Sequence, residues 1–176
     1  MPDRVISQMQ GKGFEFAVVS ELLLRGYNCA PASVDAGVDV FLLSKSGVQV
    51  KIQVKGRNFR GRGTGVESFL FSKKSYCDTL TKPDFVILVV RNLIGKARRQ
   101  PMNSYLIIPR NKFDELIKEG YVTKRENKLK LDAWAEFRQD GRVSKFVVQK
   151  GYGARKTGRE ITDYVNAWDL LSNIIT

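Results

Sequence analysis

The sequence predicts one α/β domain, with a mixed β-sheet flanked by helices. Three observations predict it: a helical pattern near the start of the chain, two strands joined by a short turn directly after it, and a fully apolar strand further on. The chain has 176 residues, of which 43% are hydrophobic. This supports one well-formed core but not two large domains, so residues 1–176 are expected to form a single domain.

The first element is a helix over residues 7–25, which Gly26 ends. At about 100° per residue, Glu15 falls between Leu22 and Val19 on one wide apolar face. A carboxylate there either pairs with a lysine or points into a cleft, because burying an unpaired charge is costly. The members of this face are Phe16, Val18, Val19, Leu22 and Leu23.

The next two strands form a hairpin. Residues 37–43 are dominated by β-branched and large apolar side chains, and residues 44–47 supply a turn to a strand over residues 48–55. Asp39 interrupts the first strand, where aspartate is disfavoured. It is therefore a candidate functional residue.

The second strand of the hairpin alternates between apolar and polar residues. Gln53 and Lys55 share one face of this strand, while Val54 points to the other. A hairpin places the start of its first strand beside the end of its second, so Asp39 is expected next to Gln53 and Lys55. The alternative is a solvated outer face, which polar alternation produces in many sheets.

This arrangement resembles the PD-(D/E)XK nuclease superfamily, whose pattern is a helix glutamate, a strand aspartate and then (D/E/Q)-x-K on the following strand. The sequences Gly-Val-Asp-Val and Ile-Gln-Val-Lys-Gly are similar to the branch that holds Holliday-junction resolvases and intron-encoded homing endonucleases. The resemblance covers residues 7–110 and implies a restriction-endonuclease-like core. Residues 111–176 would then be a C-terminal extension for DNA specificity or oligomer contacts. The matching residues are Glu15, Asp39, Gln53, Val54 and Lys55.

The resemblance implies hydrolysis of DNA phosphodiester bonds with Mg²⁺, for which Mn²⁺ can substitute. Asp39 is the implied main metal ligand, joined by the Gln53 amide oxygen and the Val54 carbonyl, while Glu15 holds a coordinated water or a second metal. Lys55 orients the attacking water and stabilises charge in the transition state. Because Gln53 replaces the usual second carboxylate, Glu15, Asp39 and Lys55 sum to a charge of −1. We therefore expect Mg²⁺ to bind appreciably only with nucleic acid present.

The charge balance favours a polyanionic partner. With 30 Lys and Arg against 18 Asp and Glu, the net charge is +12, which fits DNA, RNA or an anionic membrane surface. Double-stranded DNA is the expected partner. No apolar run reaches the roughly 20 residues of a membrane span, so no membrane partner and an intracellular, cytoplasmic location are expected. The sequence has no histidine, which excludes serine-type triads and histidine-dependent nucleases. Cys29 and Cys77 lack the spacing of a zinc site.

Candidate DNA contacts follow the predicted site along the chain. Residues 56–65 combine four glycines with three arginines, a composition that predicts a solvated loop in contact with phosphates. Residues 150–159 have a similar composition, which fits a DNA-reading loop or a mobile connector. The candidate contacts are all basic: Arg57, Arg60, Arg62, Lys73, Lys74, Arg155 and Lys156.

The remaining elements are short. The terminal helix carries one apolar stripe, which serves core packing or a subunit interface: Val165, Trp168, Leu171 and Ile175. Cleaving two DNA strands usually takes two active sites, so we expect a homo-oligomer, a dimer or higher. The predicted strands span residues 69–71, 83–90, 105–109, 128–131 and 145–148, and the predicted helices span residues 111–119 and 162–175.

The residues leave more than one function open. A site-specific endonuclease of homing or restriction type competes with a Holliday-junction resolvase and with a non-catalytic nucleic-acid-binding module that has a degraded site. The basic Gly/Arg loop and the long extension favour the sequence-reading enzyme. The presence of Glu15, Asp39 and Lys55 argues against the non-catalytic module.

Overall fold

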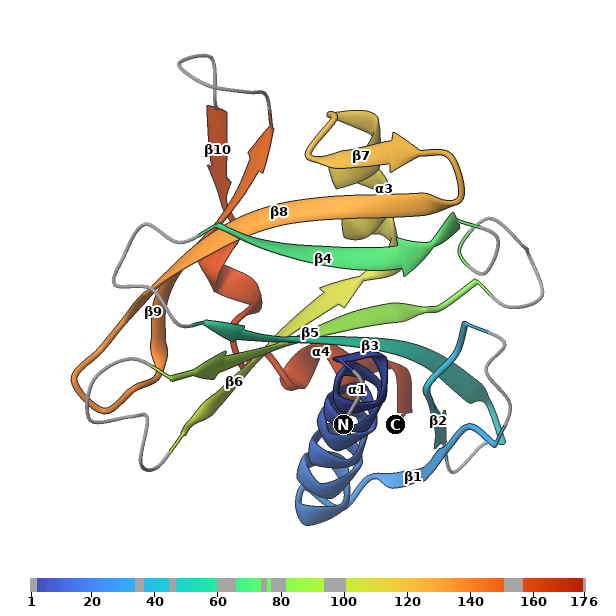
Figure 1. The fold of residues 1–176 in the computed structure, drawn as a ribbon. Helices are drawn as coiled ribbons and strands as arrows, with labels where there is room; N and C mark the ends of the chain where they lie inside the picture. The colour runs from blue at the N-terminus through green and yellow to red at the C-terminus, as the bar shows by residue number, and fades with distance from the viewer. Residues whose placement is uncertain are drawn as a thin grey trace.

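A computed structural model describes residues 3–33, 37–44, 47–59, 66–73, 76, 82–93, 101–150 and 157–175. The described chain forms two β-sheets with helices packed against them (Figure 1). This confirms the predicted α/β class and its mixed sheet. No helix in these ranges is long and apolar enough to cross a membrane.

The first sheet is mixed and has the strand order β1-β2-β3-β5-β6. β3 and β5 run parallel, and the other neighbours run antiparallel. The antiparallel β2–β3 pair is the predicted hairpin. The edge strand β1 was not predicted, because its four residues carry no clear alternation. The strands of this sheet are β1 (Asn28–Pro31), β2 (Val40–Leu43), β3 (Gln49–Phe59), β5 (Phe85–Asn92) and β6 (Asn103–Pro109).

The second sheet is antiparallel, with the order β10-β9-β8-β4 and with β7 paired to β8. The strands predicted at residues 69–71, 128–131 and 145–148 lie within it. Because β4 pairs with β8, residues 67–72 are joined to the C-terminal half of the chain. The strands of this sheet are β4 (Glu67–Ser72), β7 (Val122–Arg125), β8 (Lys128–Phe137), β9 (Val143–Lys150) and β10 (Thr157–Glu160).

The two faces of the first sheet have different covers. α1 (Asp3–Leu24) and α4 (Asp169–Ile175) pack on one face, where Phe14, Val18 and Leu22 meet the apolar residues of β3 and β5. The second sheet and α3 (Arg110–Lys118) pack on the other face. Figure 1 shows α1 and the second sheet on opposite sides of β3. α3 confirms the helix predicted at residues 111–119.

The buried face of α1 differs from the predicted one. The prediction that Phe16 and Leu23 point inward is wrong, since they are 60% and 53% exposed. The buried residues Phe14, Val18 and Leu22 recur every fourth position, which gives a narrow stripe along the line where the helix lies on the sheet. The outer side of α1 therefore carries large apolar side chains.

The prediction of one helix over residues 162–175 is also wrong. The segment forms a short 3₁₀ helix, η3 (Thr162–Tyr164), and then α4. Asn166 between them has a φ of 54°, a left-handed conformation that interrupts a helix. As a result Val165 packs on the core beneath the second sheet, while Trp168 packs on the core beneath α1.

β3 runs past its predicted end at Lys55. The prediction of a solvated loop from residue 56 is wrong for residues 56–59, because they pair with β5 and Phe59 is buried. Gly56 lies against Phe14 of α1, and a Cβ at this glycine would come within 2.0 Å of the ring. Glycine therefore allows α1 to lie directly on this part of β3.

Candidate active site

Asp39 lies just before β2 and binds β3 through both its backbone and its side chain. Its N–H donates to the Ile52 carbonyl at 2.9 Å, and its Oδ2 accepts the Val54 N–H at 2.7 Å. The carboxylate, which is buried, occupies the place where a longer β2 would continue the ladder. Asp39 is thus one residue outside the strand in which the sequence placed it.

Lys55 reaches the same carboxylate from β3. Its Nζ is 3.8 Å from Asp39 Oδ2, and its side chain is 32% exposed. An ion pair of this length and exposure adds little to stability. The ammonium group is therefore available to another anion.

β3 has an open edge at this point. β2 pairs with β3 only from Gln49 to Ile52, whereas β5 pairs with the other side of β3 as far as Phe59. In the part of the chain that the structure describes, no strand pairs with the β2 side of β3 beyond Ile52. The N–H and C=O of one strand residue point to the same side, so the Val54 carbonyl faces this open edge beside Asp39.

Gln53 is buried on β3 with one polar atom unsatisfied. The residue is 2% exposed, and its Oε1 accepts no hydrogen bond from the described residues. A buried oxygen without a donor costs about 1–3 kcal/mol, and such atoms call for an ion, a ligand or a water. By strand alternation, Gln53 lies on the same face as Lys55.

Glu15 is held by its own helix. Its Oε2 accepts a hydrogen bond from Lys12 Nζ at 2.6 Å, and no hydrogen bond or ion pair among the described residues joins it to Asp39 or Lys55. It follows Phe14, so it is carried by the turn of α1 that packs on Gly56. Within the described ranges, no three His, Cys, Asp or Glu side chains gather as a metal site. A metal site at the open edge of β3 would therefore need neutral oxygens as ligands besides the Asp39 carboxylate.

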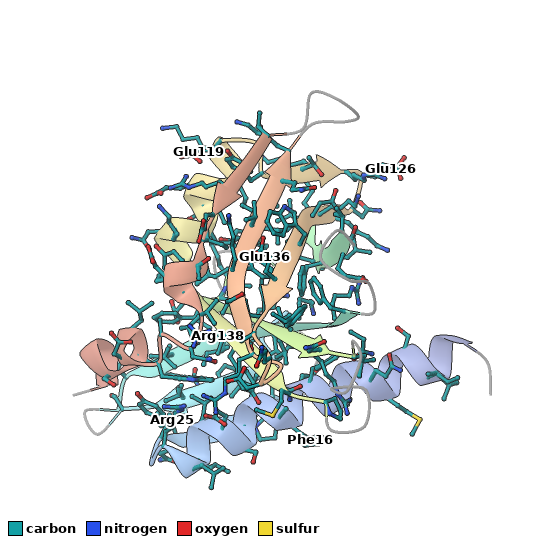
Figure 2. The ribbon with its side chains drawn as sticks, turned by 90° about the vertical axis from the view of Figure 1, so that its left-hand side faces the viewer. Phe16, Arg25, Glu119, Glu126, Glu136 and Arg138 are labelled. Carbon is teal, nitrogen blue, oxygen red and sulfur yellow. The ribbon has the colours of Figure 1, made fainter. Side chains whose placement is uncertain are left out.

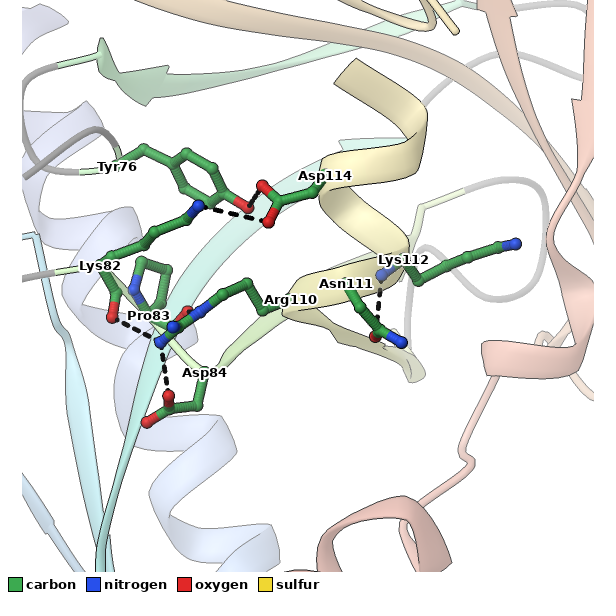
Figure 3. Close-up of polar contacts among 8 residues, drawn as sticks. All are labelled: Tyr76, Lys82, Pro83, Asp84, Arg110, Asn111, Lys112 and Asp114. Carbon is green, nitrogen blue, oxygen red and sulfur yellow. Dashed lines mark hydrogen bonds and ion pairs between the residues drawn. The ribbon is translucent and has the colours of Figure 1, made fainter. Parts of the chain in front are cut away.

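The start of β5 is fixed to β3 and α3 by Asp84. Its Oδ2 accepts the Lys51 N–H at 2.8 Å, and Arg110 donates to its Oδ1. Arg110 also donates to the carbonyls of Pro83 and Lys82, as Figure 3 shows. This contact fixes the start of β5 against β3 at Lys51, two residues before Gln53.

Two of the predicted DNA contacts, Arg57 and Lys73, can be placed, and both adjoin β4. Arg57 donates to the Ser68 carbonyl at 2.6 Å and lines a hollow of about 360 Å³ between α1 and β3. The Lys73 backbone N–H donates to the Asn127 carbonyl. The other predicted contacts lie outside the described residues: Arg60, Arg62, Lys74, Arg155 and Lys156.

A second hollow lies beside β4, over the β7–β8 hairpin. Its volume is about 730 Å³, and Arg125, Lys128 and Lys130 line it. None of these three residues was among the predicted DNA contacts. The alternation Lys128-Leu129-Lys130 predicted a strand, and the same alternation puts both lysines on one face.

Comparison with known proteins shows the fold. No protein-family model matches the chain, and no curated protein matches it. The solved structure of a bacterial homing endonuclease, I-Ssp6803I, is similar to the chain with a TM-score of 0.50 and 14% sequence identity. The match covers 96% of this chain and 93% of the other. The two chains are therefore alike in fold over nearly their whole length.

Proposed function

We propose that this chain is a metal-dependent DNA endonuclease that hydrolyses phosphodiester bonds at the open edge of β3. The observation that carries the proposal is the ion pair of Asp39 and Lys55 at this edge. Gln53, two residues before Lys55 on the same strand, has a buried oxygen that no described residue satisfies. A carboxylate, neutral oxygens and a lysine are the groups that metal-assisted hydrolysis needs. The likeness in fold to a bacterial homing endonuclease supports a DNA endonuclease. The proposal of a site-specific enzyme of the PD-(D/E)XK type rests on the sequence pattern of Glu15, Asp39 and Gln53-Val54-Lys55.

The oxygens at this edge fit a hard divalent cation. Mg²⁺ prefers oxygen ligands and keeps several waters, so a few protein oxygens suffice. Asp39 would bind it through Oδ1, because the contacts with Val54 and Lys55 both end on Oδ2. The Gln53 amide oxygen and the Val54 carbonyl would be the other protein ligands of the cation, and Mn²⁺ would substitute for Mg²⁺. When bound, the cation supplies Lewis-acid activation of the phosphate.

Lys55 supplies the positive charge on the protein side. Its ammonium is partly exposed and only loosely paired with Asp39, so it can turn to a phosphoryl oxygen or to the attacking water. Negative charge grows on the phosphoryl oxygens in the transition state. A fixed ammonium stabilises that state more than the ground state, which is the condition for catalysis.

Glu15 is proposed to hold a water at the site or a second cation. This role requires its carboxylate to exchange Lys12 for the new partner. With Lys12 bound to Glu15, the four side chains of Glu15, Asp39, Lys55 and Lys12 sum to zero charge. A DNA phosphate would supply the missing negative charge, so Mg²⁺ should bind the free protein weakly. Tight Mg²⁺ binding in calorimetry without DNA would contradict this.

Double-stranded DNA is the proposed substrate. The net charge of +12 attracts a polyanion, and Arg57 and Lys73 are the placed candidates for phosphate contacts. The basic hollow over the β7–β8 hairpin offers Arg125 and Lys128 for further contacts. Phosphate contacts release counterions, so DNA affinity should fall steeply as salt rises.

Sequencing of new DNA ends tests the proposed function directly. The purified chain is incubated with Mg²⁺ and a randomised duplex library, a four-way junction and a duplex RNA, each with and without a chelator. We expect chelator-sensitive cuts at a shared duplex motif. Cuts confined to the junction would make the enzyme a resolvase, and cuts confined to RNA would make it a ribonuclease. Binding without any cut would overturn the proposal.

A further inference from the structure

The outer side of α1 carries a line of residues that are all apolar except Lys12. The described part of the chain leaves them exposed, apart from Val19, which is partly buried against the core beneath α1. Met9 and Phe16 are each 60% exposed, and Leu23 is 53% exposed. Figure 2 labels Phe16 on the side of α1 away from the strands. Exposed apolar patches of this kind mark contacts with another molecule. We call this line the outer seam: Val5, Met9, Lys12, Phe16, Val19 and Leu23.

The spacing of the outer seam indicates another helix as its occupant. Its members are separated by four, three, four, three and four residues, which is the repeat of a coiled-coil seam. A helix in contact with a lipid surface needs a broad apolar face instead. Here the exposed Lys12 lies within the line itself. A single polar residue in such a seam sets the register of two paired helices.

The outer seam is symmetric about its own middle. In an antiparallel pair centred near residue 14, Val5 meets Leu23, Met9 meets Val19, and Lys12 meets Phe16 of the other helix. Each Lys12 then lies against an aromatic ring, a contact that does not depend on its ion pair with Glu15. In a parallel pair, two Lys12 ammonium groups would face each other, and like charges repel. Charge therefore favours the antiparallel pair.

Gly13 fits this pairing. It is an exposed glycine inside a helix, and a Cβ added there would meet nothing within 4 Å. Glycine in a helix interior is less favourable than alanine, and no described residue packs closely enough against Gly13 to require it. It lies beside the centre of the antiparallel pair, where the two helices come closest.

We infer that a second copy of this chain docks on the outer seam, with the two α1 helices antiparallel. The inference rests on α1 alone and does not require nuclease activity. If the proposed function also holds, the pairing places two active sites in one particle.

Sedimentation velocity of the full chain and of Phe16→Asp tests the pairing. We expect the wild type to be a dimer or a larger assembly. Phe16→Asp should raise the dissociation constant at least about 100-fold, because each dimer loses two central aromatic contacts. The matched control is Leu24→Asp, since Leu24 is 83% exposed on the same helix but lies off the seam. This control should assemble as the wild type does.

The result that overturns the inference is a monomeric wild type at high protein concentration, or an assembly that Phe16→Asp leaves intact. Circular dichroism and thermal melting check that Phe16→Asp folds. Recruitment of the monomer to anionic lipid vesicles through Phe16 would assign the outer seam to a membrane surface instead.

Disulfide trapping tests whether the two α1 helices run antiparallel, and it does not depend on the Phe16→Asp variant. In a background with both native cysteines replaced by serine, Lys12→Cys and Phe16→Cys proteins are mixed and mildly oxidised. The antiparallel pair predicts cross-links between position 12 of one copy and position 16 of the other. Cross-links of Phe16→Cys to itself, or at Leu24→Cys, would contradict the pairing.

Discussion

Two aspartates bind β3 in the same way and differ in what else they bind. Asp84 accepts the Lys51 N–H at 2.8 Å, and Asp39 accepts the Val54 N–H at 2.7 Å. Asp84 is also paired with Arg110, which in turn is held by two backbone carbonyls. Among the described residues, the other partner of the Asp39 carboxylate is Lys55, whose Nζ is 3.8 Å away. Both oxygens of the Asp84 carboxylate bind protein groups. The two contacts of the Asp39 carboxylate both end on Oδ2, so Oδ1 can bind a ligand.

Their places in the sheet explain the difference. Asp84 lies directly before β5, and it binds residues that belong to regular elements, Lys51 of β3 and Arg110 of α3. Asp39 lies where β2 has not yet begun, so the edge of β3 beyond Ile52 has no strand partner among the described residues. Polar groups at the end of a ladder are free to bind something other than backbone. The fold therefore leaves this edge of β3 open because β2 is shorter than β3.

Replacing each aspartate by asparagine should have the largest effect and should separate the two. Asp39→Asn keeps an acceptor for the Val54 N–H but loses the charge that a cation needs. We expect the cleavage rate to fall about 10³-fold with folding unchanged. Asp84→Asn should cut at a rate within about tenfold of the wild type, with a small loss of stability from its exposed ion pair. Equal effects of the two changes in a single-turnover cleavage assay would contradict this comparison.

Gly56→Ala should disturb the contact between α1 and the open half of β3. The new Cβ would overlap the Phe14 ring, and overpacking of this kind costs about 1–3 kcal/mol. Gly11 lies on α1, and a Cβ added there would meet nothing within 4 Å. Gly11→Ala should therefore raise the free energy of unfolding by up to about 1 kcal/mol. Urea unfolding measures both variants. A Gly56→Ala protein as stable as the wild type would show that α1 does not lie this closely on β3.

Gln53→Leu should change stability and activity in opposite directions. It removes a buried oxygen that lacks a donor, so the free energy of unfolding should stay the same or rise by about 1 kcal/mol. Cleavage should fall at least about tenfold, because a ligand for the cation is lost. Gln53→Glu should bind Mg²⁺ at least as tightly as the wild type. A fall in stability without loss of cleavage would make Gln53 an ordinary core residue.

The contact between Asp39 and Lys55 was predictable because it depends on local pairing. A hairpin brings Asp39 to the end of the next strand, and period-two alternation places Gln53 and Lys55 on one face. The contact of Asp39 Oδ2 with the Val54 N–H depends on where β2 begins. A sequence pattern does not fix that residue.

Other features depend on contacts between distant segments. Helical periodicity alone could not distinguish the inner stripe of α1 from its outer seam, since both are apolar, so Phe16 was placed inside. The second sheet pairs β4 with β8, some sixty residues later, and no local pattern reports such a pairing. The break at Asn166 is a left-handed residue within a helix-compatible sequence. Its hydrogen bonds to the Tyr105 backbone account for the break.

The most direct test of a nuclease site at the open edge of β3 compares Lys55→Ala with Lys51→Ala. Both lysines lie on the same face of β3 by alternation, but Lys51 belongs to the part that β2 covers. Mg²⁺-dependent cleavage and DNA affinity are measured for both. The account predicts a loss of about 10²–10³-fold in cleavage for Lys55→Ala alone, with DNA binding retained. Equal cleavage by the two variants, or by Lys55→Ala and the wild type, would contradict it.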